Sequence, residues 1–265
     1  MLDFLNYTFM QNALIAGILI GFLASYFGVF VVQRKMSFLG SGLSHSAFGG
    51  VALGLLLNTE PLWIAIPFTI IVSILIVYLK EKTKIETDTS IGILFSVSVA
   101  IGIILLALRK NYSGDAYSYL FGSILSVSTN DLIAISLLSV IALFTIYYKW
   151  ADWAYASFDS ELAISDKINV VRDDYLLSIL IAITIVVAMK IIGIILISAF
   201  LVIPAAAGKI ISKTFFSMTL YAILIGIFSS IIGLIFSYIF DIPSGAAIIL
   251  FQALVFVIFA IFRKK

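Results

Sequence analysis

Long apolar runs constrain this chain more than any other feature of its sequence. About 20 mostly apolar residues let one helix cross the hydrocarbon core of a bilayer, and the sequence contains nine runs of roughly this kind. Hydrophobic residues form 63% of the chain and charged residues 11%, whereas a soluble domain carries about 25% charged residues. The excess apolar surface must face lipid. We therefore predict an all-α, polytopic membrane protein and exclude a soluble enzyme, a nucleic-acid binder and a disordered chain.

Charges, prolines and polar clusters set the boundaries of the predicted spans. Lys190 divides two of the runs, and the first of these is short, so one broken or tilted element and eight crossings are the alternative to nine. The chain begins with Asp3 and no Lys or Arg, which is typical of a first membrane span rather than a cleaved signal peptide. The nine predicted spans are 9–32, 36–57, 61–79, 91–108, 130–148, 175–189, 191–208, 215–240 and 244–262.

Lys and Arg residues between the spans predict the orientation, because these residues concentrate in cytoplasmic loops. If the N-terminus is outside, thirteen of the sixteen Lys and Arg residues are cytoplasmic, and only Arg109, Lys110 and Lys190 are outside. We therefore predict an external N-terminus and a cytoplasmic C-terminus.

Little of the chain remains outside the predicted spans. In the outer segment 109–129, residues 117–126 are too apolar for a free loop and too short to cross, so we predict a re-entrant or interfacial helix packed against protein. The longest inner segment is 149–174. No linker and no convincing repeat divides the sequence, so we expect one transmembrane domain over residues 1–265 that includes this inner segment.

The second predicted span carries an ionisable side chain near its middle. His45 lies about 14 Å along a helix from Met36, close to the midplane of a bilayer core about 30 Å thick. Ser41 stands one turn earlier and can point the same way. An ionisable group at this depth indicates a function by default, and a neutral histidine bonded to a neighbouring helix is the alternative. Since imidazole is a common ligand of zinc and similar ions, we take His45 and Ser41 as the candidate metal site.

Small residues recur every four positions along the same span. On a helix they form one stripe beside that of His45, and small residues at this spacing let membrane helices approach closely. The predicted helix-packing residues are Gly42, Ser46, Gly50 and Gly54.

The inner segment predicts a short amphipathic helix over residues 158–168. Its apolar residues form the i,i+4 pairs Phe158/Leu162 and Ile164/Ile168, with polar residues between them. Acids outnumber bases here, whereas a helix on a lipid surface usually carries Lys and Arg. We therefore favour docking to a cytoplasmic protein partner over the alternative of a membrane-surface helix.

The absence of several motifs narrows the function further. The sequence has no cysteine and a single histidine, which excludes disulfides, Cys-ligated metals and any site that needs two histidines from one chain. It contains neither the G-x-x-x-x-G-K-[ST] motif of ATP binding nor the H-E-x-x-H motif of metalloproteases. No Asp or Glu lies deep in a predicted span, where ion-coupled carriers commonly place one. We predict no catalytic residue.

Seven short motifs follow one another in a fixed order along nearly the whole chain. They are RKMSFLG at 34–40, LSHSAFGGVALG at 43–54, DTSIGI at 88–93, YLFGSIL at 119–125, AMKIIG at 188–193, SAFLVIPAAA at 198–207 and DIPSG at 241–245. Each motif is weak alone, but their order is highly specific. In this order they resemble the integral membrane subunit of bacterial zinc/manganese ABC importers, and most of all the zinc-uptake permease branch.

The resemblance implies a set of partners. It implies a homodimer of permease subunits in membrane lipid, bound to two cytoplasmic ATP-binding subunits, and an extracytoplasmic metal-binding protein that delivers the ion. ATP hydrolysis would take place on the separate subunits, so this chain would not be an enzyme. It would have no covalently bound cofactor and would bind no nucleic acid. The expected location is a bacterial or archaeal cell (inner) membrane.

The resemblance also implies roles for particular residues. In the family, a carboxylate and a histidine one helical turn apart are proposed to bind the ion; His45 occupies the histidine position, and Ser41 stands where the carboxylate is usual. The coupling helix that contacts the ATPase matches the stretch around Glu161, and Lys167 stands where a glycine usually follows. The residues implied in coupling are Glu161, Leu162, Ala163 and Asp166.

We therefore expect the permease subunit of an ATP-driven importer of divalent metal ions. Imidazole and hydroxyl ligands favour zinc over the harder manganese ion, so zinc is the first expectation, with manganese and iron as alternatives. Three other functions stay open: an ABC permease for a metal chelate or cobalamin, an ion-coupled secondary carrier, and a membrane scaffold without transport.

Overall fold

The computed structural model describes residues 7–83, 85–108, 119–123 and 127–262. Every regular element in this part of the chain is a helix, which confirms the prediction of an all-α polytopic protein. The elements are α1 (Thr8–Gln33), α2 (Ser37–Leu56), α3 (Pro61–Thr83), α4 (Thr87–Leu108), α6 (Thr129–Tyr148), α7 (Trp150–Phe158), α8 (Ser160–Ser165), α9 (Val170–Ile192), α10 (Ile197–Ile211), α11 (Phe215–Phe240) and α12 (Ser244–Phe262).

Eight helices in the described ranges are long and apolar enough to cross a membrane, and α10 is a shorter apolar helix of 15 residues. The predicted division between 175–189 and 191–208 is wrong at Lys190, because α9 continues through this residue to Ile192. The helix instead ends at Gly193, whose φ of 92° suits a glycine far better than any other residue. Lys190 can stay helical because carboxylates neutralise its charge, as described below.

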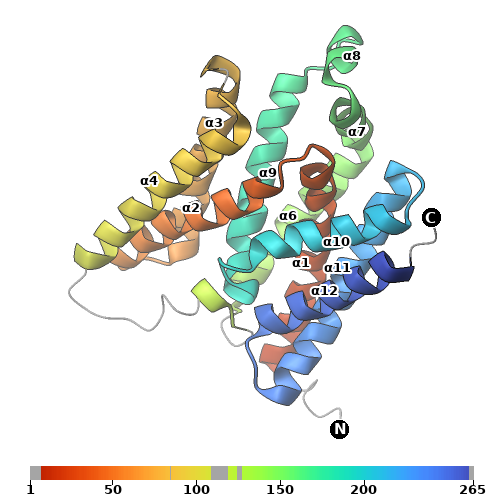
Figure 1. The fold of residues 1–265 in the computed structure, drawn as a ribbon. Helices are drawn as coiled ribbons and strands as arrows, with labels where there is room; N and C mark the ends of the chain where they lie inside the picture. The colour runs from red at the N-terminus through yellow and green to blue at the C-terminus, as the bar shows by residue number, and fades with distance from the viewer. Residues whose placement is uncertain (1–6, 84, 109–118, 124–126, 263–265) are drawn as a thin grey trace.

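Side-chain contacts gather one set of helix ends at a face that we call the basic face. There, Lys80 at the end of α3 forms an ion pair with Asp174 at the start of α9, at 3.1 Å. Lys209 near the end of α10 donates a hydrogen bond to Gln33 at the end of α1, at 3.1 Å. The short helices α7 and α8 lie at the same end of the molecule as the end of α3 (Figure 1).

The opposite helix ends meet at a second face, which we call the Lys190 face. Lys190 near the end of α9 forms an ion pair with Glu60, just before α3, and Ser244 at the start of α12 donates to the carbonyl oxygen of Ile191. Because α10 starts just after Gly193 at this face and ends at the basic face, it runs between the same two faces as the long helices over about 22 Å. Eight of the nine predicted spans therefore match helices that are long and apolar enough to cross, in agreement with the alternative of eight, and 191–208 matches the shorter α10.

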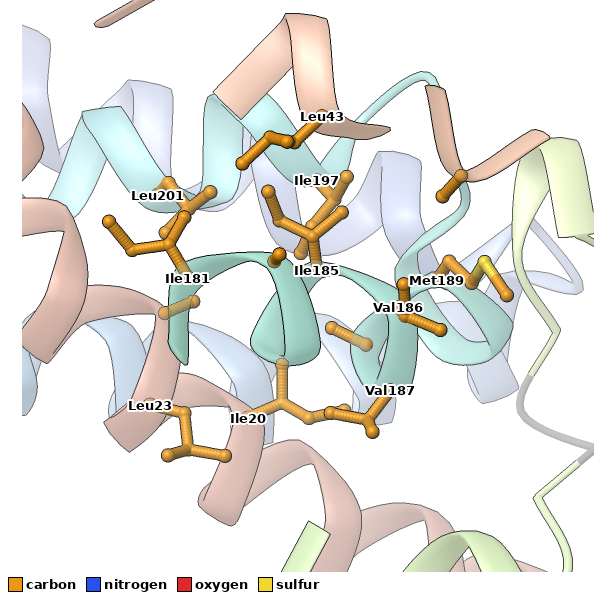
Figure 2. Close-up of a cluster of buried hydrophobic side chains, with 14 of the residues drawn as sticks. Ile20, Leu23, Leu43, Ile181, Ile185, Val186, Val187, Met189, Ile197 and Leu201 are labelled. Atoms are coloured by element: carbon orange, nitrogen blue, oxygen red, sulfur yellow. The ribbon is translucent and has the colours of Figure 1, made fainter. Parts of the chain in front are cut away.

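Helix α9 is the centre of the bundle. In Figure 1, α2, α3 and α4 stand on one side of it, and α1, α10, α11 and α12 stand on the other. Figure 2 shows the buried side chains that surround α9: Leu43 of α2 and Ile197 of α10 lie on one side of it, and Ile20 of α1 lies on the other. The core thus joins the two groups of helices through α9.

Half of the predicted re-entrant segment 117–126 lies outside the described residues. Its described part, 119–123, packs on the end of α9: the Ser123 amide donates to the Lys190 carbonyl at 2.8 Å, and the Ile194 amide donates to the Tyr119 carbonyl at 3.0 Å. Gly122 has a φ of 77° and lies so close to the backbone of Ile191 that a Cβ atom would collide with it. This stretch therefore covers the Lys190 face of α9.

Candidate functional site

His45 lies about halfway along α2, on a partly exposed stripe of that helix. Its ring is half-buried and packs edge-on against the ring of Phe95 on α4, with centroids 5.2 Å apart and planes at 74°. No residue in the described ranges forms a hydrogen bond with the imidazole. The alternative of a histidine bonded to a neighbouring helix is therefore not what the described structure contains, and the ring nitrogens are available to a ligand.

Ser41 lies one turn before His45 on α2 and is also half-buried. Its backbone carbonyl oxygen accepts a hydrogen bond from the Ser44 hydroxyl at 3.0 Å, and its own hydroxyl forms no hydrogen bond with a described residue. No group of three or more His, Asp or Glu side chains that could hold a metal ion occurs within the described part of the chain. One copy of this chain thus offers one imidazole and one hydroxyl at this position.

The stripe of small residues on α2 faces its own neighbours in the bundle. A Cβ atom at Gly50 would lie 2.6 Å from Ala65 Cα, and a Cβ at Gly54 would lie 2.7 Å from Pro61 Cα, so this half of α2 packs closely on α3. At the other end of the stripe, a Cβ at Gly42 would overlap the side chain of Ile91 on α4. Ser46 is buried between them, and its hydroxyl donates to the Gly42 carbonyl at 2.7 Å.

The neighbouring stripe, about 100° away around the helix, is only partly covered. Gly49 on this stripe is buried, and a Cβ atom there would lie 2.8 Å from the Ser98 carbonyl oxygen of α4. Ser41 and His45, earlier on the same stripe, stay partly exposed. The imidazole therefore lies where the contact between α2 and α4 opens.

The predicted single amphipathic helix over 158–168 is wrong. Two helices, α7 and α8, meet at Asp159, whose extended backbone ends α7. The Asp159 carboxylate accepts hydrogen bonds from the amides of Glu161 and Leu162 at 3.1 and 3.0 Å, and so caps the N-terminus of α8. Because of this break, Phe158 and Leu162 are not one turn apart on a continuous helix.

The predicted coupling residues take different positions on α8. Glu161 and Leu162 are exposed, Leu162 to 54%, whereas Ala163 is fully buried and cannot present its side chain to a partner. Asp166 follows α8 and accepts a hydrogen bond from the Tyr155 hydroxyl of α7 at 2.7 Å; this bond raises the pKa of that hydroxyl. With Ile164 exposed as well, α8 presents an apolar, acid-flanked surface beyond the basic face.

Three contacts fix α7 to the helix bundle. Trp153 is fully buried, and its ring packs edge-on against Phe30 at the end of α1, with centroids 5.5 Å apart. The ring of Phe158 packs on Phe215 at the start of α11, also at 5.5 Å. Lys149, just before α7, forms an ion pair with buried Asp173 of α9 at 3.2 Å.

The environment of Lys149 strengthens the last of these contacts. Burial alone would lower the pKa of Lys149, but its hydrogen bonds to Asp152 and Asp173 hold the pKa above its ordinary value. The lysine therefore remains charged and paired. Together the three contacts connect α7 to α1, α9 and α11.

Two ion-pair clusters were missed at the level of the sequence. At the basic face, Arg34 and Lys80 share Asp174. At the Lys190 face, the Lys190 ammonium lies 3.0 Å from Asp131 of α6 and 2.8 Å from Glu60. The only signal was the presence of acids next to the ends of predicted spans, because the partners stand 59 to 140 positions apart.

Comparison with known proteins finds relatives that match almost the whole chain and are named as membrane proteins of metal transport systems. Residues 6–263 match the family described as the ABC 3 transport family. The chain is 36% identical over 253 residues to the high-affinity zinc uptake system membrane protein ZnuB of Haemophilus influenzae, a match that covers 96% of this chain and 97% of the relative. It is 36% identical over 266 residues to the manganese transport system membrane protein MntC of Listeria monocytogenes, covering 98% and 93%. Among solved structures, PsaBC from Streptococcus pneumoniae in complex with Fab has a chain that superposes with a TM-score of 0.86 at 35% identity, covering 97% of this chain and 93% of that one.

Proposed function

This chain belongs to the ABC 3 transport family, and from that membership we propose that it passes zinc ions through the membrane along the partly exposed His45 stripe of α2. It is a permease subunit of an ATP-driven metal importer and a multi-pass protein of the inner membrane. It is not itself an enzyme, since ATP hydrolysis belongs to a separate subunit. The identity of the ion, the binding residues and the oligomeric state are the proposal.

The observation that carries the proposal is an imidazole without a hydrogen-bond partner in the described structure, halfway along a membrane helix and partly exposed. Placing an ionisable side chain at this depth of a membrane costs free energy, so a histidine here indicates a function. The Phe95 ring packs against the imidazole and limits its rotation, and no described residue forms a hydrogen bond with the ring nitrogens. These are the features of a ligand that is kept in place before the ion arrives.

A second copy of the chain would complete the ligand set. Zinc usually takes four ligands, at about 2.0–2.1 Å from imidazole nitrogen, and one copy offers only His45 and Ser41. In a two-fold symmetric dimer the same surface of each subunit meets its counterpart, so two imidazoles and two hydroxyls or waters can surround one ion. We propose that the His45 stripes of two subunits face each other across the translocation path.

The ligand chemistry favours zinc over manganese. Imidazole is a borderline ligand that suits zinc, whereas manganese prefers carboxylate oxygens, and Ser41 supplies a neutral hydroxyl in place of a carboxylate. The relatives above are named for zinc in one case and manganese in the other. Binding without a carboxylate would also be weak enough to let the ion leave.

We propose that ATP acts on the permease from the basic face, which faces the cytoplasm in the predicted orientation. The exposed side chains Glu161, Leu162 and Ile164 of α8 form the surface for the ATP-binding subunit, with Asp166 at its edge. Since α7 is fixed to α1, α9 and α11, a push on α8 would move the helix bundle. An extracytoplasmic metal-binding protein would deliver the ion at the Lys190 face.

Uptake of radioactive zinc by the reconstituted complex tests the role of His45. The assembly contains the permease, its ATP-binding subunit and its metal-binding protein in lipid vesicles. The His45→Ala variant should lose at least about tenfold in uptake, since even outer-shell partners of a metal contribute this much. The matched control is Ser44→Ala, which removes a hydroxyl that only donates to a carbonyl on the same helix. Unchanged uptake by His45→Ala would remove the ligand role.

The competing functions give different results in the same vesicles. A chelate or cobalamin permease would take up the complexed metal and not the free ion, and its uptake would not depend on His45. An ion-coupled secondary carrier would work without ATP and would not purify with an ATP-binding subunit. A scaffold would show no uptake at all.

A further inference from the structure

Arg34 occupies the connection between α1 and the helix that carries His45. It is the C-cap residue of α1, and only Lys35 and Met36 separate it from Ser37, the first residue of α2. The connection is tight, with Lys35 at a φ of 57° and the Met36 amide bonded to the Val31 carbonyl at 2.9 Å. Because the turn is so short, a displacement of Arg34 must reach the first turn of α2.

The guanidinium of Arg34 joins this connection to two other elements at once. Its Nε donates to the Ser157 hydroxyl of α7 at 2.9 Å, and its Nη1 donates to the carboxylate of Asp174 on α9. The Arg34 side chain is 12% exposed and that of Asp174 is 16% exposed, so water screens the ion pair only partly. A planar guanidinium fixes the angle between the two bonds, and α7 and α9 therefore hold Arg34 in one position.

The partners of Arg34 are themselves fixed. The Ser157 hydroxyl donates to the Trp153 carbonyl at 2.6 Å, which leaves its oxygen to accept from Arg34. Trp153 is the fully buried residue that packs against Phe30. Asp174 also receives Lys80 from the end of α3 at 3.1 Å. A movement of α7 would therefore pull on Arg34 instead of being absorbed by loose side chains.

A small cavity lies beside Arg34. It is lined by Arg34, Met36, Lys80, Asp174 and Ser178, together with Thr87 at the start of α4 and apolar side chains. The second amine of the guanidinium, Nη2, is buried and has no hydrogen-bond partner in the described residues, and the same holds for the Ser178 hydroxyl. The guanidinium therefore has one unused donor, which a different position of Arg34 could satisfy.

We infer that Arg34 is the positioning residue that transmits the movement of α7 and α8 to α2 and thus to His45. The inference rests on the proposed function of His45 and α8. In one state Arg34 joins Ser157 to Asp174, as in this structure. When the ATP-binding subunit displaces α7, the guanidinium follows Ser157 and takes the first turn of α2 with it.

The decisive variant is Arg34→Lys. A lysine keeps the charge and the ion pair with Asp174, but its single ammonium cannot bond Ser157 and Asp174 with the fixed geometry of a guanidinium. The matched control is Lys35→Gln, which changes an exposed cation at the next position. A second variant, Ser157→Ala, removes the α7 half of the link and leaves Arg34 in place.

The measurement is the number of zinc ions taken up per ATP hydrolysed by the complete reconstituted complex. Arg34→Lys and Ser157→Ala should hydrolyse ATP at close to the normal rate and lower the ratio of uptake to hydrolysis by about tenfold, the factor that one hydrogen bond to a charged group supplies. Lys35→Gln should keep the normal ratio. A normal ratio in Arg34→Lys, or an equal fall of uptake and hydrolysis in both variants, would overturn the inference.

The two proposals fail in distinguishable ways. If His45 is not on the ion path, His45→Ala keeps normal uptake. The ratio of uptake to hydrolysis in the Arg34 variants does not depend on that result, because each variant is compared with its own ATP hydrolysis. If Arg34 has only a structural role, its variants lose assembled complex and both activities together.

Discussion

The buried ion pair at the Lys190 face gives a sharp prediction about stability. The Lys190 ammonium bonds both carboxylate oxygens of Asp131 at 3.1 and 3.0 Å, and Asp131 is only 4% exposed. Removing one partner of such a pair costs about 3–5 kcal/mol, because a buried charge is left without its counter-charge. Asp131 would keep its bonds from the Ser128 amide and hydroxyl at 2.8 and 2.7 Å. We therefore expect Lys190→Met to lie at the lower end, about 3 kcal/mol.

The same geometry predicts that a second substitution restores stability. Adding Asp131→Asn to Lys190→Met removes the orphaned charge and keeps a side chain that can still accept from Ser128, so the double variant should be about 1–2 kcal/mol more stable than Lys190→Met alone. Glu60 is the internal control, because its side chain is 49% exposed and Glu60→Gln should cost less than about 1 kcal/mol.

Thermal unfolding of the purified protein in detergent, followed by the fluorescence of its three tryptophans, measures these differences. For a chain of this size about 3 kcal/mol corresponds to a fall of roughly 6–12 °C in Tm. The reasoning is refuted if the double variant is less stable than Lys190→Met, or if Glu60→Gln costs as much as Lys190→Met.

Three further predictions concern other parts of the fold. Gly50→Leu should destabilise the protein by about 1–3 kcal/mol, because its Cβ would lie 2.6 Å from Ala65 Cα, whereas Gly92→Ala, with no atom within 4 Å of the new Cβ, should leave Tm unchanged. Gln252→Leu should leave Tm unchanged or raise it, because both amide atoms of Gln252 are buried without a partner among the described residues. Lys149→Met should lower the free energy of unfolding by the same amount from neutral pH to about pH 9. The raised pKa of Lys149 stabilises the fold at every pH below the ordinary lysine pKa of 10.5, and this stabilisation is lost only as the pH rises above that value. A destabilisation that is already smaller at pH 8 than at neutral pH would contradict this.

The helices were predictable because a membrane span needs about 20 consecutive, mostly apolar residues, and such runs are visible in the sequence. Apolar runs locate the spans, and the structure moves their ends by a few residues only, as where α9 begins at Val170 in place of 175. The one wrong division came from treating Lys190 as a helix end. A charge ends a membrane span only if nothing neutralises it, and Asp131 and Glu60 come from two other segments. No local pattern contains that information.

The arrangement of residues around the candidate site was partly predictable. The position of His45 halfway along a helix and the glycine stripe beside it follow from spacing, and the structure has both on α2, whereas the role of His45 as a ligand stays a prediction. The break at Asp159 was readable in principle, since Asp is a preferred N-cap residue, but the i,i+4 apolar pairs suggested a continuous helix. The contacts of Arg34 were not readable, because Ser157 and Asp174 follow it by 123 and 140 positions.

Zinc K-edge X-ray absorption on the permease and its ATP-binding subunit, reconstituted without the metal-binding protein and loaded with less than one zinc ion per two permease chains, tests most directly whether His45 binds the ion. We predict imidazole nitrogen at about 2.0–2.1 Å in the wild-type protein and the loss of this imidazole signal in His45→Ala, with Ser44→Ala giving the wild-type spectrum. A zinc ion with the same coordination in wild type and His45→Ala would contradict the assignment of this helix as the ion path.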